Sequence, residues 1–289
     1  MKTLFTSILL AGSLASSWAA TTVNITNKFS YGANIGWMDW RGDTNSGAVI
    51  GQYVCSGFIY AANVGWINLG GGLPANDIRY QNNSATDFGV NHDGVGNLRG
   101  FAYGANIGWI NFENNGAAKV DLFTGKLSGS IYSANCGWVS LSNAFAFVQT
   151  DHIRMGADTD GDGITDAWEL SHTNSLGAFT ATSDSDGDGF SDLSEYLADT
   201  DPLDPSSNLR ITSSSVAFIG GNDNESLTWT TQPTRQYRVQ YRDDLNPGFP
   251  WMTLDTLYSS SGADTTQTIG LAPPSSQRFF RIQSSLPLP

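Results

Sequence analysis

The sequence is poor in basic residues, histidine and cysteine. Of its 289 residues, only 14 are Lys or Arg, three are His and two are Cys. A chain without a basic patch is a poor partner for the phosphate backbone of DNA or RNA, so we expect no nucleic-acid binding. Past the N-terminus, no stretch approaches the ~20 apolar residues of a membrane-spanning helix. We therefore expect no membrane span in the mature chain.

The few histidines and glutamates form no catalytic motif. His92, His152 and His172 are scattered along the chain, and none of them lies in a nucleophile motif. A glycosidase needs a pair of catalytic carboxylates. Glu113 and Asp39 are one conceivable pair, and no pattern in the sequence supports it. We therefore expect a protein that is not an enzyme.

The N-terminus predicts export. Met1–Thr3 gives a short positive start, Leu4–Gly12 is an apolar run too short to span a bilayer, and Ser17–Ala19 places small residues at the expected cleavage site. The alternative, a buried N-terminal helix, lacks an amphipathic stripe. Residues 1–19 are thus predicted to be a signal peptide, cleaved after Ala19, and the mature chain to be secreted or held at the cell surface.

Export also bears on the two cysteines. In an oxidising compartment Cys55 and Cys136 can form a disulfide. Buried free thiols are also common in proteins. The sequence leaves both alternatives open.

The net charge of −13 comes from one segment. Residues 151–205 hold 12 Asp and two Glu against the single base Arg154, whereas the rest of the chain has 13 acidic and 13 basic residues. Such a density of carboxylates repels itself unless cations neutralise it. The segment is therefore expected to bind cations.

Two loops of twelve residues inside this segment have the spacing of calcium ligands. Calcium takes six to eight oxygen ligands, and alternate residues of a tight loop direct their carboxylates to one centre around a sharp turn at a glycine, here Gly163 and Gly189. The expected side-chain ligands are Asp158, Asp160, Asp162, Asp166 and Glu169 in the first loop and Asp184, Asp186, Asp188, Asp192 and Glu195 in the second, with backbone carbonyls from Ile164 and Phe190. A solvated acidic linker has no reason to keep this spacing, and magnesium prefers a smaller octahedron. Two Ca²⁺ ions are predicted.

Each loop leads into a short predicted helix, Ala167–His172 or Leu193–Ala198, and no helix is expected before Asp158. The loops and the following Thr200–Pro205 resemble thrombospondin type 3 repeats, especially bacterial ones. The resemblance covers about a fifth of the chain and implies that residues 151–206 act as a rigid, calcium-stiffened spacer. Position eight is polar (Thr165 and Ser191), unlike the aliphatic residue that joins paired EF-hand loops, which argues against a calcium switch.

Residues 20–150 contain four copies of a Tyr-x-Ala-Asn-x-Gly-Trp pattern. The copies are Tyr31–Trp37, Tyr60–Trp66, Tyr103–Trp109 and Tyr132–Trp138, so a constant offset of 72 residues relates the first pair to the second. Each copy reads as a hairpin with a tight turn, because Asn and Gly tolerate positive φ. The pattern predicts an all-β barrel or sandwich built from a duplicated pair of repeats. It resembles repeats in uncharacterised secreted bacterial proteins, which implies no function.

The repeated aromatic residues have two interpretations. Exposed Tyr and Trp rings stack on sugars, but we favour core positions, because each repeat must bury an apolar face against its neighbours. The turn asparagines, Asn34, Asn63, Asn106 and Asn135, are expected to form turns rather than bind a ligand. A Gly stands three residues before the Tyr in copies two to four; copy one has Lys28 there and is expected to be a capping repeat.

Residues 207–289 alternate apolar and polar side chains between turn-rich stretches. Leu227–Thr230, Tyr237–Tyr241 and Phe279–Ile282 read as strands of a small β-sandwich. Trp229 and the strand at Tyr237–Tyr241, followed by Leu271–Pro273, are similar to a fibronectin type III module.

Together the sequence predicts a mainly β, secreted calcium-binding protein for extracellular binding or adhesion, with a carbohydrate or cell-surface polymer as a possible partner. The alternative is a polysaccharide hydrolase or its carbohydrate-binding subunit; a surface-layer role is a third hypothesis. Carboxylates clustered in a groove of residues 20–150 favour the enzyme, an exposed aromatic strip favours sugar binding, and self-association in calcium favours the surface layer.

Overall fold

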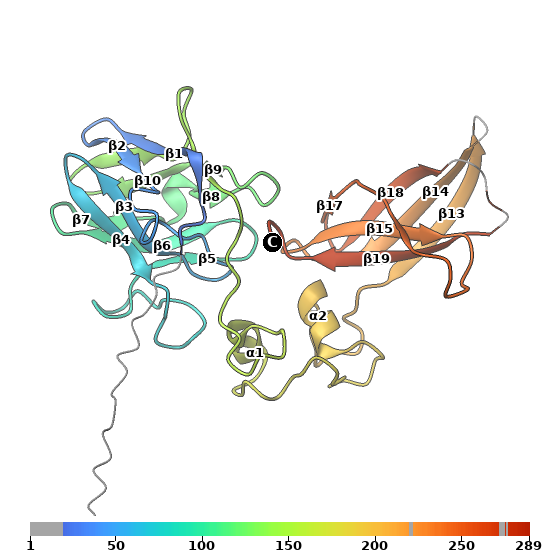
Figure 1. Ribbon diagram of the computed structural model, residues 1–289. Coiled ribbons are helices and arrows are strands. Elements are labelled where there is room, and N and C mark those ends of the chain that lie inside the picture. Colours follow the sequence, from blue (N-terminus) through green and yellow to red (C-terminus); the bar gives the residue numbers. More distant parts are fainter. Residues whose placement is uncertain (1–19, 220–221, 272–274, 276) are drawn as a thin grey trace, which may run out of the picture.

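A computed structural model describes residues 20–219, 222–271, 275 and 277–289; the predicted signal peptide lies outside these residues. The chain forms an N-terminal barrel, a segment with two short helices, and a C-terminal pair of sheets (Figure 1). The mainly β fold and the position of the helices confirm the sequence-based prediction. In the described part of the chain, no helix is both long and apolar enough to cross a bilayer.

The N-terminal domain is a closed barrel of four hairpins. The hairpins are β1 (Val23–Gly32) with β2 (Gly36–Asp39), β3 (Ser56–Ala61) with β4 (Gly65–Gly71), β6 (Leu98–Gly104) with β7 (Gly108–Asn111), and β10 (Ser130–Ser133) with β11 (Gly137–Ser140). Strand β1 also pairs with β11, which joins the first hairpin to the last. The prediction of a capping repeat is therefore wrong, because a closed barrel has no end repeat.

Shorter elements surround the barrel. Strand β12 (Val148–Thr150) pairs with β1, β5 (Val90–His92) pairs with β6, and β8 (Lys119–Val120) pairs with β9 (Leu127–Ser128); η1 (Asn114–Gly116) follows β7. The glycine three residues before each Tyr in copies two to four has φ between +80° and +96°. A Cβ there would lie 2.2–2.4 Å from a backbone oxygen, so this position requires glycine.

The core of the barrel includes the residues that follow each repeat Trp. Met38, Ile67, Ile110 and Val139, which follow the four Trp residues, are buried. The Trp residues themselves are 46–50% exposed and the Tyr residues 39–40% exposed, with the two ring centroids 4.9–5.0 Å apart in each hairpin. The prediction that these rings form the core is wrong. The small interior of an eight-stranded barrel takes the aliphatic residues next to the repeat rings, together with Trp40 and Phe112, and the repeat Tyr and Trp rings lie on the outer face.

The four hairpin turns are connected in a ring. The Nδ2 amide of each turn asparagine donates to a backbone carbonyl of the neighbouring turn: Asn34 to Cys136, Asn63 to Ile35, Asn106 to Val64 and Asn135 to Ile107, over 3.0–3.1 Å. Only the glycine of each turn has positive φ, at +71° to +82°. The asparagines therefore act through their side chains, and not through the left-handed backbone that the sequence suggested.

We expect Asn63→Ala to lower the free energy of unfolding of the barrel by about 1 kcal/mol, because one hydrogen bond between turns is lost and the Ile35 carbonyl loses its donor. Urea unfolding followed by Trp fluorescence measures this change, and the exposed Asn83→Ala is the control. An unchanged transition would show that the ring of turns contributes nothing.

Both cysteines are buried free thiols. Cys136 lies in the fourth turn, whereas Cys55 lies just before β3. Of the two alternatives left open by the sequence, the structure has the free thiols. Burial raises the pKa of the Cys55 thiol to about 12, so this side chain stays protonated.

The C-terminal domain is a sandwich of two antiparallel sheets. One sheet has β13 (Ile211–Ile219), β14 (Asn222–Thr230) and β18 (Asp264–Leu271); the other has β15 (Gln236–Arg242), β16 (Met252–Thr253), β17 (Tyr258–Ser259) and β19 (Phe279–Ser285). Trp229 from the first sheet and Tyr237 and Val239 from the second share one core. This confirms the predicted β-sandwich.

Candidate metal centres

The two acidic loops have the same backbone conformation, because the first aspartate of each loop accepts hydrogen bonds from equivalent N–H groups of its own loop. Asp158 accepts hydrogen bonds from the N–H groups of Gly161 and Gly163, at 2.8 and 3.0 Å. Asp184 accepts from Gly187 and Gly189, at 2.8 and 2.9 Å. These four glycines have φ between +78° and +96°, which bends each loop around its first carboxylate.

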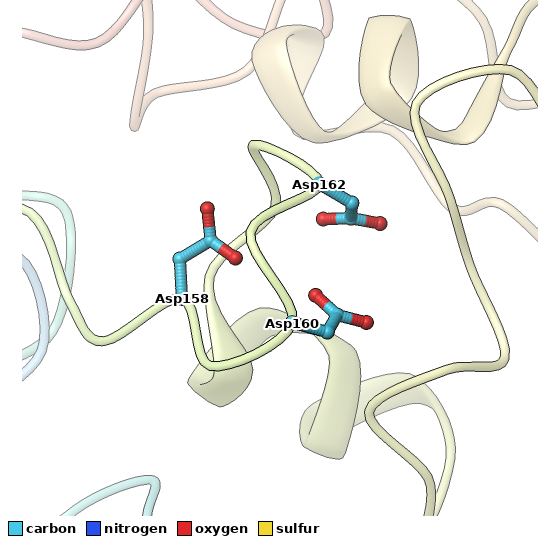
Figure 2. A group of neighbouring side chains, drawn as sticks. All are labelled: Asp158, Asp160 and Asp162. Carbon is cyan, nitrogen blue, oxygen red and sulfur yellow. The ribbon is translucent and has the colours of Figure 1, made fainter.

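Three carboxylates meet in each loop. Oxygens of Asp158, Asp160 and Asp162 all lie within 4.8 Å of one another, and those of Asp184, Asp186 and Asp188 do the same. Figure 2 shows the first group, with the three side chains directed toward the space between them. The structure thus brings together the predicted ligands at positions one, three and five of both loops.

The glutamate at position twelve of each loop brings further oxygens that lack a partner. Glu169 is fully buried, and neither of its carboxylate oxygens has a hydrogen-bond partner among the described residues. The same holds for one oxygen each of Asp162, Asp186 and Glu195. An unpartnered buried carboxylate is costly, and a hard divalent cation relieves this cost.

The pKa values of these glutamates follow from the same environment. Burial, together with the neighbouring aspartates, raises the pKa of Glu169 to about 7 and that of Glu195 to about 8 in the metal-free chain. A bound Ca²⁺ stabilises the ionised form of both groups. The residues present therefore fit calcium, held by the carboxylates of positions one, three, five and twelve.

The carboxylates at position nine have a further role, which the sequence did not indicate. Asp166 accepts from the N–H and the hydroxyl of Thr159, at 2.7 and 2.6 Å. Asp192 accepts from the N–H and the hydroxyl of Ser185, both at 3.0 Å. Both aspartates are buried and fasten position two of their loop to the start of the following helix. Their role as metal ligands stays a prediction.

The residues at position seven also brace the loops. The N–H of Ile164 donates to Asp162, and that of Phe190 donates to Asp188, at 2.9 and 2.8 Å. The Ile164 side chain is buried. The carbonyl ligands predicted at these two positions remain predictions.

The exit helices are α1 (Asp166–His172) and α2 (Asp192–Ala198), each beginning one residue before its predicted start. Among the described residues no β-bridge joins the two loops. This agrees with the polar residues at position eight.

A family model described as Bacterial TSP3 repeat matches residues 158–175 and 184–205. These two segments are similar to the bacterial thrombospondin type 3 repeat. The match and the aspartate clusters together indicate calcium binding by residues 158–205, called the TSP3-like segment below. No curated protein and no solved structure matches the chain. The resemblances noted for the other two regions stay predictions.

The TSP3-like segment has a small core of its own, and this core also receives side chains from both β domains. Ile164, Trp168, Phe179 and Tyr196 are buried together. Tyr53 from the barrel domain and Leu286, just after β19, pack against them. The segment is therefore a joint between the two domains, and not only a spacer of fixed length.

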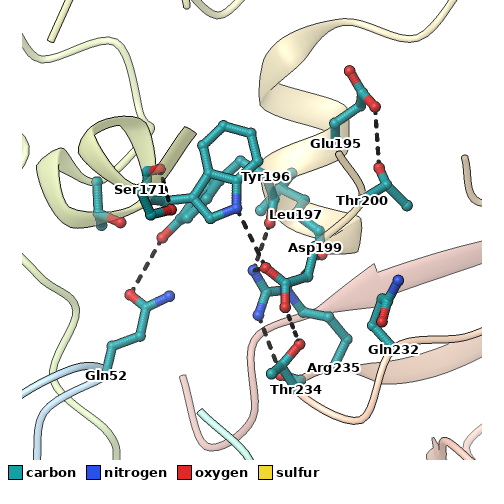
Figure 3. Close-up of polar contacts among 12 residues, drawn as sticks. Gln52, Ser171, Glu195, Tyr196, Leu197, Asp199, Thr200, Gln232, Thr234 and Arg235 are labelled. Atoms are coloured by element: carbon teal, nitrogen blue, oxygen red, sulfur yellow. Dashed lines mark hydrogen bonds and ion pairs between the residues drawn. The ribbon is translucent and has the colours of Figure 1, made fainter. Parts of the chain in front are cut away.

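Polar contacts around α2 tie this joint to the sandwich (Figure 3). The buried guanidinium of Arg235 donates to the carbonyls of Tyr196 and Leu197, at 2.6 and 3.1 Å, and pairs with Asp199 at 3.4 Å. Asp199 has φ +58°, and it also accepts from the hydroxyl of Thr234. Arg235 thus satisfies carbonyls at the C-terminus of α2 and complements the helix dipole.

Further hydrogen bonds connect the parts of the chain. Tyr196 donates to Gln52 of the barrel domain over 3.4 Å, and Asn208, which precedes β13, donates to Asp188 of the second loop over 2.9 Å. Sequence reasoning missed Gln52, Asn208 and Arg235, since each acts on a distant segment and stands in no local motif.

Proposed function

We propose that this is a secreted, non-catalytic protein for extracellular binding, in which two calcium ions stiffen the joint between a barrel and a β-sandwich. The observation that carries the proposal is the core shared by both loops, into which Tyr53 and Leu286 insert. An ion that orders the loops also orders the core against which Tyr53 and Leu286 of the two β domains pack.

The absence of a catalytic role is part of this proposal. The carboxylates considered for a glycosidase both have structural partners: Glu113 accepts from the N–H of Gly100 at 2.8 Å, and Asp39 pairs with Lys28 at 2.7 Å. The exposed aromatic residues of the barrel support a binding role instead of the hydrolase.

Calorimetry on the chelated chain tests the calcium part. We expect two ions per chain, with a Kd of about 0.1–1 mM as in extracellular modules. Asp160→Ala, which removes the ligand oxygens at position three, should remove the first site and Asp186→Ala the second, so that each variant binds one ion. Asp255→Ala, at an exposed acid outside residues 151–206, is the control. No heat of calcium binding, or two sites in both loop variants, would contradict the proposal.

A further inference from the structure

The outer face of the barrel repeats one combination of side chains at all four seams between hairpins. At each seam a polar residue lies directly across from the Tyr of the next hairpin, and that Tyr lies across from its own Trp. The four sets are Asp39, Tyr60 and Trp66; Asn68, Tyr103 and Trp109; Asn111, Tyr132 and Trp138; and Ser140, Tyr31 and Trp37. Each set covers two strand spacings, about 10 Å, on the outer face.

The aromatic pair in each set is solvent-exposed and fixed in place. Trp109 and Trp138 are 46% and 50% exposed, and each ring contacts its Tyr at about 5 Å between centroids. Cross-strand pairing fixes the two rings, so that little rotamer entropy remains to be lost on binding. Phe88 adds a third ring against Trp109, at 5.1 Å.

The polar residue differs between seams, and two of the four carry an unused donor. Asn68 accepts from the N–H of Gly70, and Asn111 accepts from the N–H of Glu113, through their Oδ1 atoms. Because a backbone N–H must face the amide oxygen, these contacts identify the Oδ1 atom of each asparagine. The Nδ2 amide therefore faces away from that backbone donor. Among the described residues neither amide has an acceptor. By contrast, Asp39 is paired with Lys28, and Ser140 donates to the carbonyl of Ser142.

We propose that the seams at Asn68 and Asn111 bind neutral pyranose units of a polysaccharide. The C–H face of a sugar packs on an aromatic ring, and its hydroxyl oxygens accept hydrogen bonds from the fixed amide. Outside residues 151–205 the chain carries equal numbers of acidic and basic residues, which suits an uncharged polymer. Two equivalent seams side by side on a closed barrel allow one polymer chain to engage both, which raises the apparent affinity.

This inference deepens the proposed extracellular binding and rests on it, but it does not depend on calcium. The test is affinity gel electrophoresis of the full chain, in calcium and in EGTA, with hydroxyethylcellulose, mixed-linkage β-glucan, arabinoxylan or galactomannan in the gel. Retardation is measured against a gel without polysaccharide. Calcium titration of the same samples tests the joint separately, so failure of one proposal is distinguishable from failure of the other.

We expect at least one polysaccharide to retard the wild type equally with and without calcium. The double variant Trp109→Ala/Trp138→Ala should bind at least tenfold more weakly. Asn68→Asp/Asn111→Asp, which keeps the acceptor oxygen and replaces the donor amide, should bind at least fivefold more weakly with an unchanged circular dichroism spectrum. Phe145→Ala removes a fully exposed aromatic residue of the same domain and should bind within twofold of the wild type.

Three results would overturn the inference. The first is the absence of retardation by all four polysaccharides. The second is retardation that persists in the asparagine variant, which also decides the question if the tryptophan variant does not fold. The third is a wild type that is dimeric by light scattering while the tryptophan variant is monomeric. The aromatic face would then be covered by a second copy of the chain.

Discussion

Removing calcium with EGTA should open residues 151–206 to proteolysis while both β domains stay folded. Without cations the carboxylates of each loop repel one another, and the buried oxygens of Glu169 have no hydrogen-bond partner in the part of the chain that the structure describes. At a calcium concentration ten times the Kd, each site contributes about 1.4 kcal/mol, so loss of both ions should raise the open fraction of the joint about 100-fold. Limited proteolysis with mass spectrometry measures the rate and the cleavage sites.

The barrel and the sandwich should persist because each has its own core, separate from that of the joint. Magnesium at the same concentration should not restore protection, since it binds flexible all-protein sites weakly. If all three parts became sensitive together, the chain would fold as one cooperative unit and the interpretation of the segment as a joint would fail.

Arg235→Met should separate the sandwich from the joint. The substitution removes the side-chain donor to the carbonyls of Tyr196 and Leu197 and leaves Asp199 without its cation. Loss of a buried charged partner costs about 3–5 kcal/mol, but Asp199 is partly exposed and water recovers part of this, so we expect about 2–3 kcal/mol. Hydrogen exchange at residues 192–199 should increase by about 30-fold or more.

The controls for Arg235→Met come from the same strand and from the same position. Arg238→Met, on β15 and half-buried, should have little effect. Arg235→Lys keeps the charge but cannot reach two carbonyls and a carboxylate with a planar fork, so an intermediate effect is expected. If residues 192–199 of Arg235→Met exchanged hydrogen at the wild-type rate, the contacts of Arg235 would not be what stabilises α2.

The calcium loops were predictable because all their ligands lie within twelve residues. The spacing of Asp158 to Glu169 fixed both the ligand type and the turn at Gly163, and the structure brings the aspartates together accordingly. The second role of Asp166 was not predictable, because a carboxylate that braces Thr159 has the same sequence signature as one that binds metal. The role of Arg235 was not predictable for another reason. Its partners lie almost 40 residues away in the sequence, and no periodic pattern includes it.

The hairpins of the barrel were predictable from their turns, but the direction of the rings was not. Trp66 and Ile67 are both apolar and lie on opposite faces of β4, so their own hydropathy does not say which of them points inward. The number of strands decides it, since eight strands enclose too little space for four Trp–Tyr pairs. The closing pair of β1 with β11 joins residues more than 100 positions apart, which no local pattern records.

The registers at the seams of the barrel show how its two halves are related. Asn68 lies across from Tyr103 where β4 meets β6, and Ser140 lies across from Tyr31 where β11 meets β1. A shift of 72 residues converts Tyr31 to Tyr103 and Asn68 to Ser140, so the two seams are the same contact. One pair of hairpins alone has two unpaired edges, and a second copy satisfies both. The barrel is thus equivalent to a twofold-symmetric homodimer whose protomers have been fused into one chain.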